Sequence, residues 1–203
     1  MNRRLGVLIS GRGSNLQAII DAIAERRLDA TIAVVMSNRP GARGLERARA
    51  AGIDTVVLEP GAFDSREAYD AALAAVLRRY DVRLVCLAGF MRLLSPVFVD
   101  AFPGAILNVH PSLLPAFPGV DAQRQALEHG VKVAGCTVHV VTAELDAGPI
   151  ILQATVPVRP DDTVDTLSAR ILIEEHRLYP EAIRLVLGGG WRIEGRRFVP
   201  APA

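Results

Sequence analysis

The sequence predicts one α/β domain built on a mostly parallel, twisted sheet, and three observations support this prediction. Short runs rich in Val, Ile and Leu alternate with longer amphipathic stretches, which is the pattern of βαβ units. Strands connected in this way lie parallel and carry helices on both faces of the sheet. The 203 residues, 50% hydrophobic and 22% charged, suit one folded domain and exclude disordered, collagen-like and coiled-coil chains.

The first half of the chain shows the alternation most regularly. Its predicted strands are Leu5–Ile9, Thr31–Met36, Thr55–Leu58, Val82–Ala88 and Ala105–Val109. Its predicted helices are Ser14–Arg26, Arg43–Ala51 and Arg66–Arg79, and a further helix begins at Ser95-Pro96. Gly52 follows the second helix at the position where a left-handed residue commonly ends a helix.

The second half is less regular. Ser112–Gly119 is a predicted loop, Asp121–His129 a helix, and Val133–Val141 and Ile150–Val158 are longer strands. Thr163–Leu187 is a long predicted helix, in which Pro180 predicts a kink or break. Trp191–Ile193 and Arg197–Val199 flank Glu194-Gly195-Arg196 as a C-terminal hairpin. We expect a single Rossmann-like domain over 1–203, with halves 1–110 and 111–203.

Charge and composition exclude several functions and locations. Lys and Arg number 23 against 22 Asp and Glu, a formal net charge of +1, which gives no support for nucleic-acid or membrane-surface binding. Leu5–Ile9 is too short for a signal peptide core, and Leu84–Met91 is too short to span a membrane. Cys86 and Cys136 lie in apolar runs that suit buried thiols, so we expect a cytoplasmic protein.

Ligands of parallel sheets bind beyond the carboxyl ends of the strands, where Ser10–Asn15 follows the first predicted strand. This glycine-containing turn opens a helix, as anion-binding loops do. A dinucleotide site is not predicted, because Leu16 stands where the third glycine would fall and Asn38 replaces the acidic residue. A Walker loop is also excluded, since no Gly-Lys-Ser/Thr is present. The loop is either a phosphate monoester site or a turn capped by Ser14 or Asn15.

Asn108 and His110 end another strand, and their spacing of two places both side chains on one face. An amide and an imidazole side by side can stabilise an oxyanion and transfer a proton, or they can simply cap a strand end. Asp146, in the loop Thr142–Pro149, would orient and activate the histidine, unless that loop is an acidic surface turn. His139 is assigned a supporting role. The scattered cysteines and histidines show no spacing typical of a metal site.

The segment Leu87–Leu94 stays apolar where a buried strand runs into a loop. Such a wall suits a flat heteroaromatic ligand, with Arg92 available to pair with an anionic tail. Alternatively, these side chains cover the core of the domain.

Seven segments occur together in one order: Ser-Gly-x-Gly-Ser-Asn-Leu-Gln-Ala at 10–18, Ser-Asn-Arg at 37–39, Gly-Leu-Glu-Arg-Ala at 44–48, Phe-Asp-Ser-Arg at 63–66, Leu-Ala-Gly-Phe-Met-Arg-Leu-Leu-Ser-Pro at 87–96, Asn-Val-His-Pro-Ser-Leu-Leu-Pro at 108–115 and Glu-Leu-Asp-Ala-Gly-Pro-Ile at 144–150. In these segments the chain resembles the folate-dependent phosphoribosylglycinamide formyltransferase family. The resemblance covers nearly the whole sequence and implies a formyltransferase-type fold.

The resemblance implies transfer of a formyl group from 10-formyltetrahydrofolate to the amine of glycinamide ribonucleotide, without a metal. Gly13, Ser14 and Asn15 then hold the phosphate within the half 1–110. The catalytic group is Asn108, His110 and Asp146, and 111–203 is the folate and catalytic half. The folate is surrounded by Arg66, Met91, Arg92, Leu93, Leu94, Asn108, Thr142, Ala143, Glu144 and Leu145. Glu175 lies near the ribose, which replaces our interpretation of 174–176 as a solvated helix face.

Two alternatives remain beside this activity. A formyltetrahydrofolate hydrolase uses the same folate site with water as the acceptor, but usually carries a further N-terminal domain, which we do not expect before Leu5. A non-catalytic nucleotide-binding module is disfavoured by the intact Asn108, His110 and Asp146. Ala116 and Asp121 stand where the family frequently has a lysine and a histidine. These two differences affect the substrate contacts expected of the segment around the loop Ser112–Gly119. We expect a monomer or weak homodimer.

Overall fold

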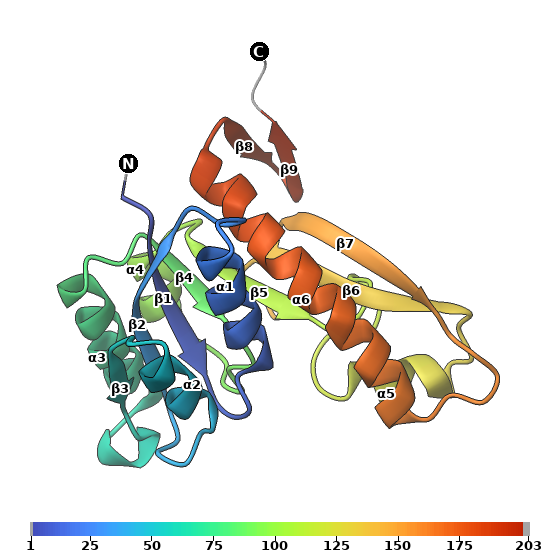
Figure 1. The fold of residues 1–203 in the computed structure, drawn as a ribbon, viewed down its shortest axis with the longest axis horizontal. Coiled ribbons are helices and arrows are strands. Elements are labelled where there is room, and N and C mark those ends of the chain that lie inside the picture. Colours follow the sequence, from blue (N-terminus) through green and yellow to red (C-terminus); the bar gives the residue numbers. More distant parts are fainter. Residues whose placement is uncertain (1, 201–203) are drawn as a thin grey trace. The chain divides into compact units, whose positions relative to one another are not determined.

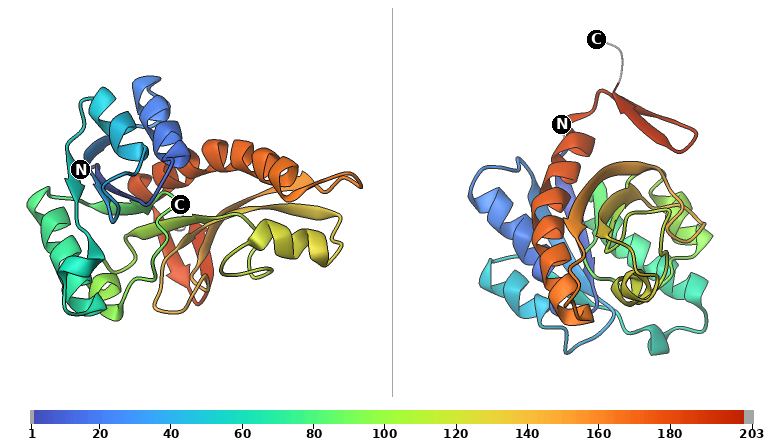
Figure 2. Two further views of the ribbon diagram at one scale, coloured as in Figure 1. Left: turned by 90° about the horizontal axis from the view of Figure 1, so that it is seen from below. Right: turned by 90° about the vertical axis from the view of Figure 1, so that its right-hand side faces the viewer.

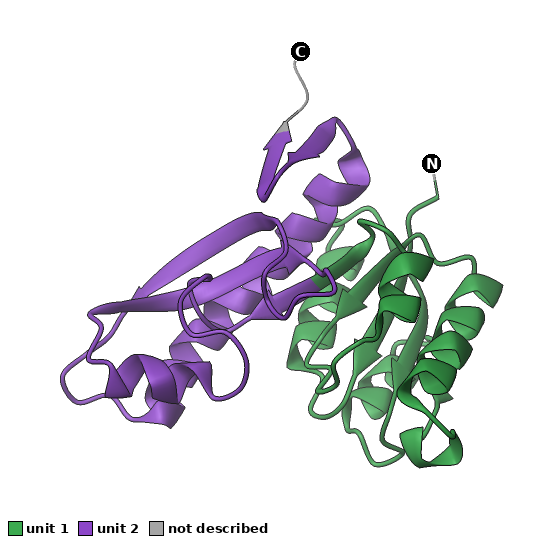
Figure 3. Ribbon diagram, turned by 180° about the vertical axis from the view of Figure 1, so that it is seen from behind, with its two compact units in different colours: residues 1–107 green, residues 108–203 purple. Residues whose placement is uncertain are grey.

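Strands and helices alternate from the start of the computed structural model, which describes residues 2–200 (Figure 1). The chain divides into two compact units, Met1–Leu107 and Asn108–Ala203 (Figure 3). The division falls within a strand, three residues before the boundary at 110 that we expected between the two halves. Within residues 2–200, no helix combines the length and the apolarity that a membrane span requires.

Unit 1 contains a parallel sheet of apolar strands. The strands are β1 Arg4–Ile9, β2 Thr31–Ser37, β3 Thr55–Val57 and β4 Leu84–Leu87. The first two residues of β5 Ile106–His110 also belong to unit 1. They lie in the order β3-β2-β1-β4-β5, and β1 pairs in parallel with both β2 and β4. Their continuous apolar runs are explained by burial, because Leu5, Val7 and Leu8 are completely inaccessible to solvent.

Helices cover both faces of this sheet. They are α1 Ser14–Ala24, α2 Gly44–Ala50, the 3-10 turn η1 Pro60–Ala62, α3 Arg66–Arg79 and α4 Pro96–Ala101. Figure 2 shows α1 and α2 on one face and α3 and α4 on the other. Ser65 caps α3 by accepting a hydrogen bond from the main-chain N–H of Ala68. Gly52 follows α2 with φ +70°, which confirms the predicted left-handed helix end.

Unit 2 contains a mixed sheet. It comprises the end of β5 with β6 Val133–Val140, β7 Ile150–Pro157, β8 Trp191–Glu194 and β9 Arg197–Pro200. Their order is β5-β6-β7-β9-β8, with β6 antiparallel to β7 and β8 antiparallel to β9. The predicted C-terminal hairpin is therefore confirmed, with Gly195 at φ +61° in its turn.

Two helices accompany the sheet of unit 2, α5 Ala122–Glu128 and α6 Val164–Gly188. The helix α6 packs on β6 and β7 and begins with a capping box formed by Thr163 and Thr166. The break predicted at Pro180 is wrong, because α6 continues through this residue as one helix. Leu167, Ile171 and Tyr179 are fully buried on its inner face, and this packing holds the helix together across the proline.

Candidate active site

The loop Ser10–Gly13 joins β1 to α1 in unit 1. Gly13 caps α1 in a left-handed conformation, with φ 69°, and no side chain makes a capping hydrogen bond. The alternative prediction that Ser14 or Asn15 caps this helix is therefore wrong. The first N–H groups of an α-helix have no partners within the helix, and here no capping side chain takes them. This arrangement suits the binding of an anion at the start of α1.

The segment 89–94 follows β4 and is tied to this loop. Ser10 N–H donates to the Gly89 carbonyl over 3.1 Å, and the Ser10 hydroxyl oxygen accepts from Met91 N–H over 2.8 Å. Phe90 is buried, whereas Met91 is 73% and Leu93 58% exposed. The alternative that this segment covers the core therefore holds for Phe90 and is wrong for Met91 and Leu93. Two large apolar side chains stand in solvent beside the loop, as a ligand-binding wall would require.

The helix α3 contacts this segment and the start of α4 through Tyr69 and Asp70. The Arg92 guanidinium lies 4.9 Å from the centre of the Tyr69 ring, and Asp70 Oδ2 accepts from Ser95 N–H over 2.6 Å. Burial raises the pKa of Tyr69 to about 12, so its hydroxyl stays protonated at physiological pH. Arg66 begins the same helix and is exposed at its surface. Arg66 and the segment Met91–Leu94, the residues of unit 1 predicted to bind folate, therefore both depend on α3 for their position.

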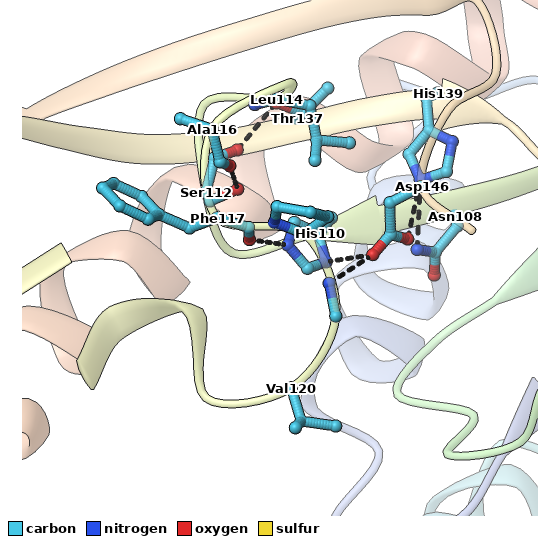
Figure 4. A network of polar contacts seen from close by, with 12 residues as sticks. Asn108, His110, Ser112, Leu114, Ala116, Phe117, Val120, Thr137, His139 and Asp146 are labelled. Atoms are coloured by element: carbon cyan, nitrogen blue, oxygen red, sulfur yellow. Dashed lines mark hydrogen bonds and ion pairs between the residues drawn. The ribbon is translucent and has the colours of Figure 1, made fainter. Parts of the chain in front are cut away.

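The predicted catalytic residues come together in unit 2. Asn108 and His110 end β5, and Asp146 lies in the loop between β6 and β7. Asp146 Oδ2 lies 3.5 Å from His110 Nδ1, and its Oδ1 lies 3.7 Å from Nε2 of His139 on β6. Figure 4 shows Asp146 between His110 on one side and Asn108 with His139 on the other. The alternative of an acidic surface turn is wrong for Asp146, since its side chain is only 9% exposed.

His139 is neutral and orients Asn108. Burial lowers its pKa from the ordinary value of 6.5, and this outweighs the Val140 carbonyl and Asp146 carboxylate, which favour the charged form. His139 Nδ1 lies 3.1 Å from the Val140 carbonyl, which can only accept, so Nδ1 carries the proton. Nε2 then accepts the hydrogen bond from Asn108 Nδ2 over 3.2 Å. This bond fixes the orientation of the Asn108 amide.

Both ring nitrogens of His110 face hydrogen-bond acceptors. Nε2 lies 2.9 Å from the Phe117 carbonyl, and Nδ1 faces the Asp146 carboxylate. A neutral ring has one N–H and can satisfy one of these acceptors, whereas the protonated ring can donate to both. With Nε2 directed at the Phe117 carbonyl, a proton on Nδ1 would point toward the Asp146 carboxylate.

The loop Ser112–Gly119 completes the cluster through main-chain groups. Its Phe117 has φ +55°, a conformation that bulky residues rarely adopt, and its ring packs against His129 at 5.1 Å. Gly119 N–H donates to Asp146 Oδ2 over 2.8 Å. Sequence analysis missed both main-chain partners, because they carry no side-chain signal beyond the Pro118-Gly119 turn.

The remaining predicted residues are distributed over the two units. Gly13, Ser14, Asn15, Arg66 and Met91–Leu94 belong to unit 1. The structure places Thr142–Leu145 in the loop that carries Asp146, and Glu144 and Leu145 are exposed there. Glu175 lies on α6 and is 7% exposed, so our interpretation of it as part of a solvated face is wrong. The geometry thus assembles Asn108, His110 and Asp146 directly and adds His139 to them.

Comparison with known proteins identifies the family of this site. The family model described as formyl transferase matches residues 3–183. The chain belongs to the formyl transferase family. Phosphoribosylglycinamide formyltransferase of Escherichia coli is 53% identical over 190 residues, which cover 94% of this chain and 87% of that protein. The crystal structure of glycinamide ribonucleotide transformylase 1 from Symbiobacterium toebii has a TM-score of 0.97 and 62% identity, covering 99% and 95% of the two chains.

A second kind of relative is much longer. The human trifunctional purine biosynthetic protein adenosine-3 is 50% identical over 186 residues, which are 92% of this chain. The chain spans 18% of the length of that protein. This formyl transferase therefore corresponds to one part of a larger protein in animals, and to most of a shorter protein in bacteria.

Proposed function

We propose that the protein transfers the formyl group of 10-formyltetrahydrofolate to the amine of glycinamide ribonucleotide, yielding formylglycinamide ribonucleotide and tetrahydrofolate in purine biosynthesis. The observation that carries this proposal is the group of Asn108, His110, His139 and Asp146, in which both histidines are buried. A neutral amide donor, a histidine between two acceptors and a carboxylate are the groups that acyl transfer to an amine requires. The similarity to enzymes named for this reaction, in bacteria and in animals, supports the choice of substrates.

Asn108 stabilises the negative charge that develops on the formyl oxygen. The neutral amine of the ribonucleotide forms a bond to the formyl carbon, and the bond from that carbon to the folate nitrogen breaks. The amide of Asn108 has two N–H groups, of which one is used in its hydrogen bond to His139. The second is left to donate to the oxyanion, and His139 ensures that the amide presents its nitrogen at this point.

His110 and Asp146 assist the transfer of the single proton that moves in the reaction. The attacking amine loses this proton and the departing folate nitrogen gains it. Protonated His110 also stabilises the oxyanion, and Asp146, 3.5 Å from Nδ1, stabilises the charged ring. The proton passes through His110 or through a water molecule held by Asp146. This mechanism needs no covalent enzyme intermediate and no metal.

The substrates are held by the residues that match the family motifs. We propose that Gly13, Ser14 and Asn15 bind the ribonucleotide phosphate at the start of α1, and that Glu175 contacts the ribose. From the family motifs we further propose folate-binding residues in each unit: Arg66 and Met91–Leu94 in unit 1, and Asn108 and Thr142–Leu145 in unit 2. The exposed Met91 and Leu93 support an apolar wall for the folate ring system.

We further propose that the protein acts in the cytoplasm as a monomer or weak homodimer, without nucleic acid or membrane partners. Cys86 and Cys136 are buried thiols, which fits a reducing compartment. The net charge of +1 gives no general attraction to nucleic acids. Asn108, His110, His139 and Asp146 all come from one chain, so the catalytic cluster needs no partner subunit.

The decisive experiment mixes the protein with 10-formyltetrahydrofolate, with and without glycinamide ribonucleotide, and follows the release of tetrahydrofolate. We expect release that depends on the ribonucleotide and forms an equal amount of its formyl derivative. Equal release without the ribonucleotide would instead identify a hydrolase. No release in either mixture, combined with binding of the ribonucleotide, would identify a non-catalytic binding module.

A further inference from the structure

The short helix α2 contacts the loop Ser10–Gly13 at its carbonyl groups. None of the residues of α2 has been assigned a role so far. Gly44 N–H donates to the Gly11 carbonyl over 3.0 Å. Arg47, one turn further along α2, donates from Nε to the Arg12 carbonyl over 3.0 Å. Its Nη1 also donates to Gln17 Oε1 on α1 over 3.1 Å. Two successive carbonyls of the loop are thus bound by α2.

A pair of glycines brings the loop and α2 into direct main-chain contact. A Cβ atom on Gly13 would lie 2.6 Å from Gly44 Cα. A Cβ atom on Gly44 would lie 3.1 Å from Gly13 Cα and 2.6 Å from Ile9 Cδ1. The two distances of 2.6 Å are shorter than real Cβ contacts, and 3.1 Å is tighter than most of them, so each glycine makes room for the other. Gly13 additionally has φ +69°, which side-chain-bearing residues rarely adopt.

These contacts decide which way the peptide groups of the loop point. A carbonyl turned toward an anion repels it, whereas an N–H attracts it. The Gly11 and Arg12 carbonyls are fixed toward α2 by their donors on Gly44 and Arg47. The start of α1, which follows Gly13 directly and has no side-chain cap, is thereby left to present its N–H groups to a ligand.

We propose that Gly44 and Arg47 are positioning residues, which hold the loop in the conformation that binds the ribonucleotide phosphate. This inference rests on the proposed function, because it takes the phosphate of glycinamide ribonucleotide as the ligand of the loop. Neither residue needs to touch the substrate. Their contribution is to the position of the loop, and it therefore affects the ribonucleotide far more than the folate.

The first test adds one methyl group at residue 44. Gly44→Ala presses on Gly13, which must shift by a few tenths of an ångström, and this is less than the ~1 Å displacement that can cost up to ~10²-fold. We expect the Kd for glycinamide ribonucleotide, measured by calorimetry, to rise about tenfold, with the Kd for tetrahydrofolate nearly unchanged. Gly41→Ala is the matched control, because a Cβ there meets nothing within 4 Å. It should bind both ligands like the wild type.

A double variant separates the loop from the core. Ile9→Val removes the Cδ1 atom that a methyl at residue 44 would strike, but leaves the contact with Gly13. The double variant Ile9→Val/Gly44→Ala should have nearly the thermal stability of Ile9→Val alone. It should nevertheless bind the ribonucleotide more weakly than Ile9→Val does. Recovery of ribonucleotide binding together with stability would show that only core packing was disturbed, and would overturn the inference.

The second test acts on an exposed side chain and does not endanger folding. Arg47→Gln should weaken ribonucleotide binding about tenfold, since it removes the hydrogen bond to the Arg12 carbonyl. Arg47→Lys keeps the charge but loses the fork that reaches Arg12 and Gln17 together, so it should resemble Arg47→Gln. Arg49→Gln removes the same charge from the same helix and should bind normally. Normal binding by Arg47→Lys would show that charge alone matters, which contradicts the positioning role.

The wild type distinguishes failure of this inference from failure of the proposed function. If the wild-type protein binds no glycinamide ribonucleotide, the proposed function is wrong, and the inference falls with it. If the wild type binds and Gly44→Ala and Arg47→Gln bind equally well, the proposed function stands and the positioning role is refuted.

Discussion

Replacing Asp146 by asparagine removes the negative charge from the centre of the catalytic cluster and preserves its shape. Asp146 has φ +49°, and asparagine adopts this left-handed conformation as readily as aspartate does. The Asn side-chain oxygen can still accept the hydrogen bond from Gly119 N–H. Alanine at the same position would lose that acceptor and strain the backbone, so asparagine is the cleaner change.

The geometry sets the expected magnitude. The Nδ1 and Oδ2 atoms of His110 and Asp146 are 3.5 Å apart, and the side chains are 6% and 9% exposed. At an effective dielectric constant of about 20, the attraction of the charged pair is about 5 kcal/mol. If desolvation offsets about half of it, the positive charge that develops on His110 in the transition state loses ~2–3 kcal/mol of stabilisation in the variant. We therefore expect kcat for formyl transfer to fall about 10²-fold.

The assay is a double-mutant cycle on kcat, with tetrahydrofolate release as the signal. His110→Ala introduced into Asp146→Asn should cost little more than the worse single change, because the two residues act as one unit. Asp161→Asn, an exposed carboxylate in the same unit, is the control and should retain full activity. Fully multiplicative losses, or an Asp146→Asn variant with near wild-type kcat, would refute the coupling.

Three further outcomes follow from the site and its surroundings. Asn108→Ala should lower kcat about 10²–10³-fold with a modest effect on folate affinity, and a normal kcat would remove Asn108 from the mechanism. Because burial lowers the pKa of His139, the unfolded chain binds a proton there more readily, so stability is complete above about pH 6.5 and falls at lower pH. Below pH 6.5 this effect gives the free energy of unfolding a slope of up to about 1.4 kcal/mol per pH unit. The slope, measured by urea unfolding at several pH values, should be lost in His139→Gln, and an unchanged slope would contradict this account. Burial raises the pKa of Cys136 to about 12, so a thiol reagent at pH 8 should label Cys136 only after unfolding.

Hydrophobic periodicity predicted the helices and strands well, because each element satisfies its own pattern of burial. The break that the proline rule predicted at Pro180 is absent, because tertiary packing overrides this local preference. A proline inside a helix costs about 3 kcal/mol. The buried Leu167, Ile171 and Tyr179 of the same helix each contribute ~1.5–3 kcal/mol, so packing on the sheet outweighs the missing hydrogen bond. No pattern within the helix itself reveals that balance.

The side chains of the proposed catalytic group could be found in the sequence because their chemistry is visible in it. Asn108 and His110 share a strand face, and Asp146 is a carboxylate in a loop. The main-chain partners could not be predicted in this way. The Phe117 carbonyl reaches His110 from a residue whose own side chain points to no role in the reaction, and its left-handed conformation is set by contacts from other segments.

The loop Ser112–Gly119 and the loop between β6 and β7 together form the surroundings of the proposed catalytic group. Asp146 and Phe117 both occupy left-handed conformations, which cost energy unless neighbouring contacts hold them. Gly119 N–H binds Asp146, and the Phe117 carbonyl binds His110 at the end of β5, so the loop Ser112–Gly119 supports both residues. At the base of the second loop, a Cβ on Gly148 would lie 1.8 Å from the Val140 carbonyl oxygen. The Gly-Pro pair that closes this loop is therefore required for the position of the carboxylate, and the charge beside His110 depends on a glycine that takes no part in the chemistry.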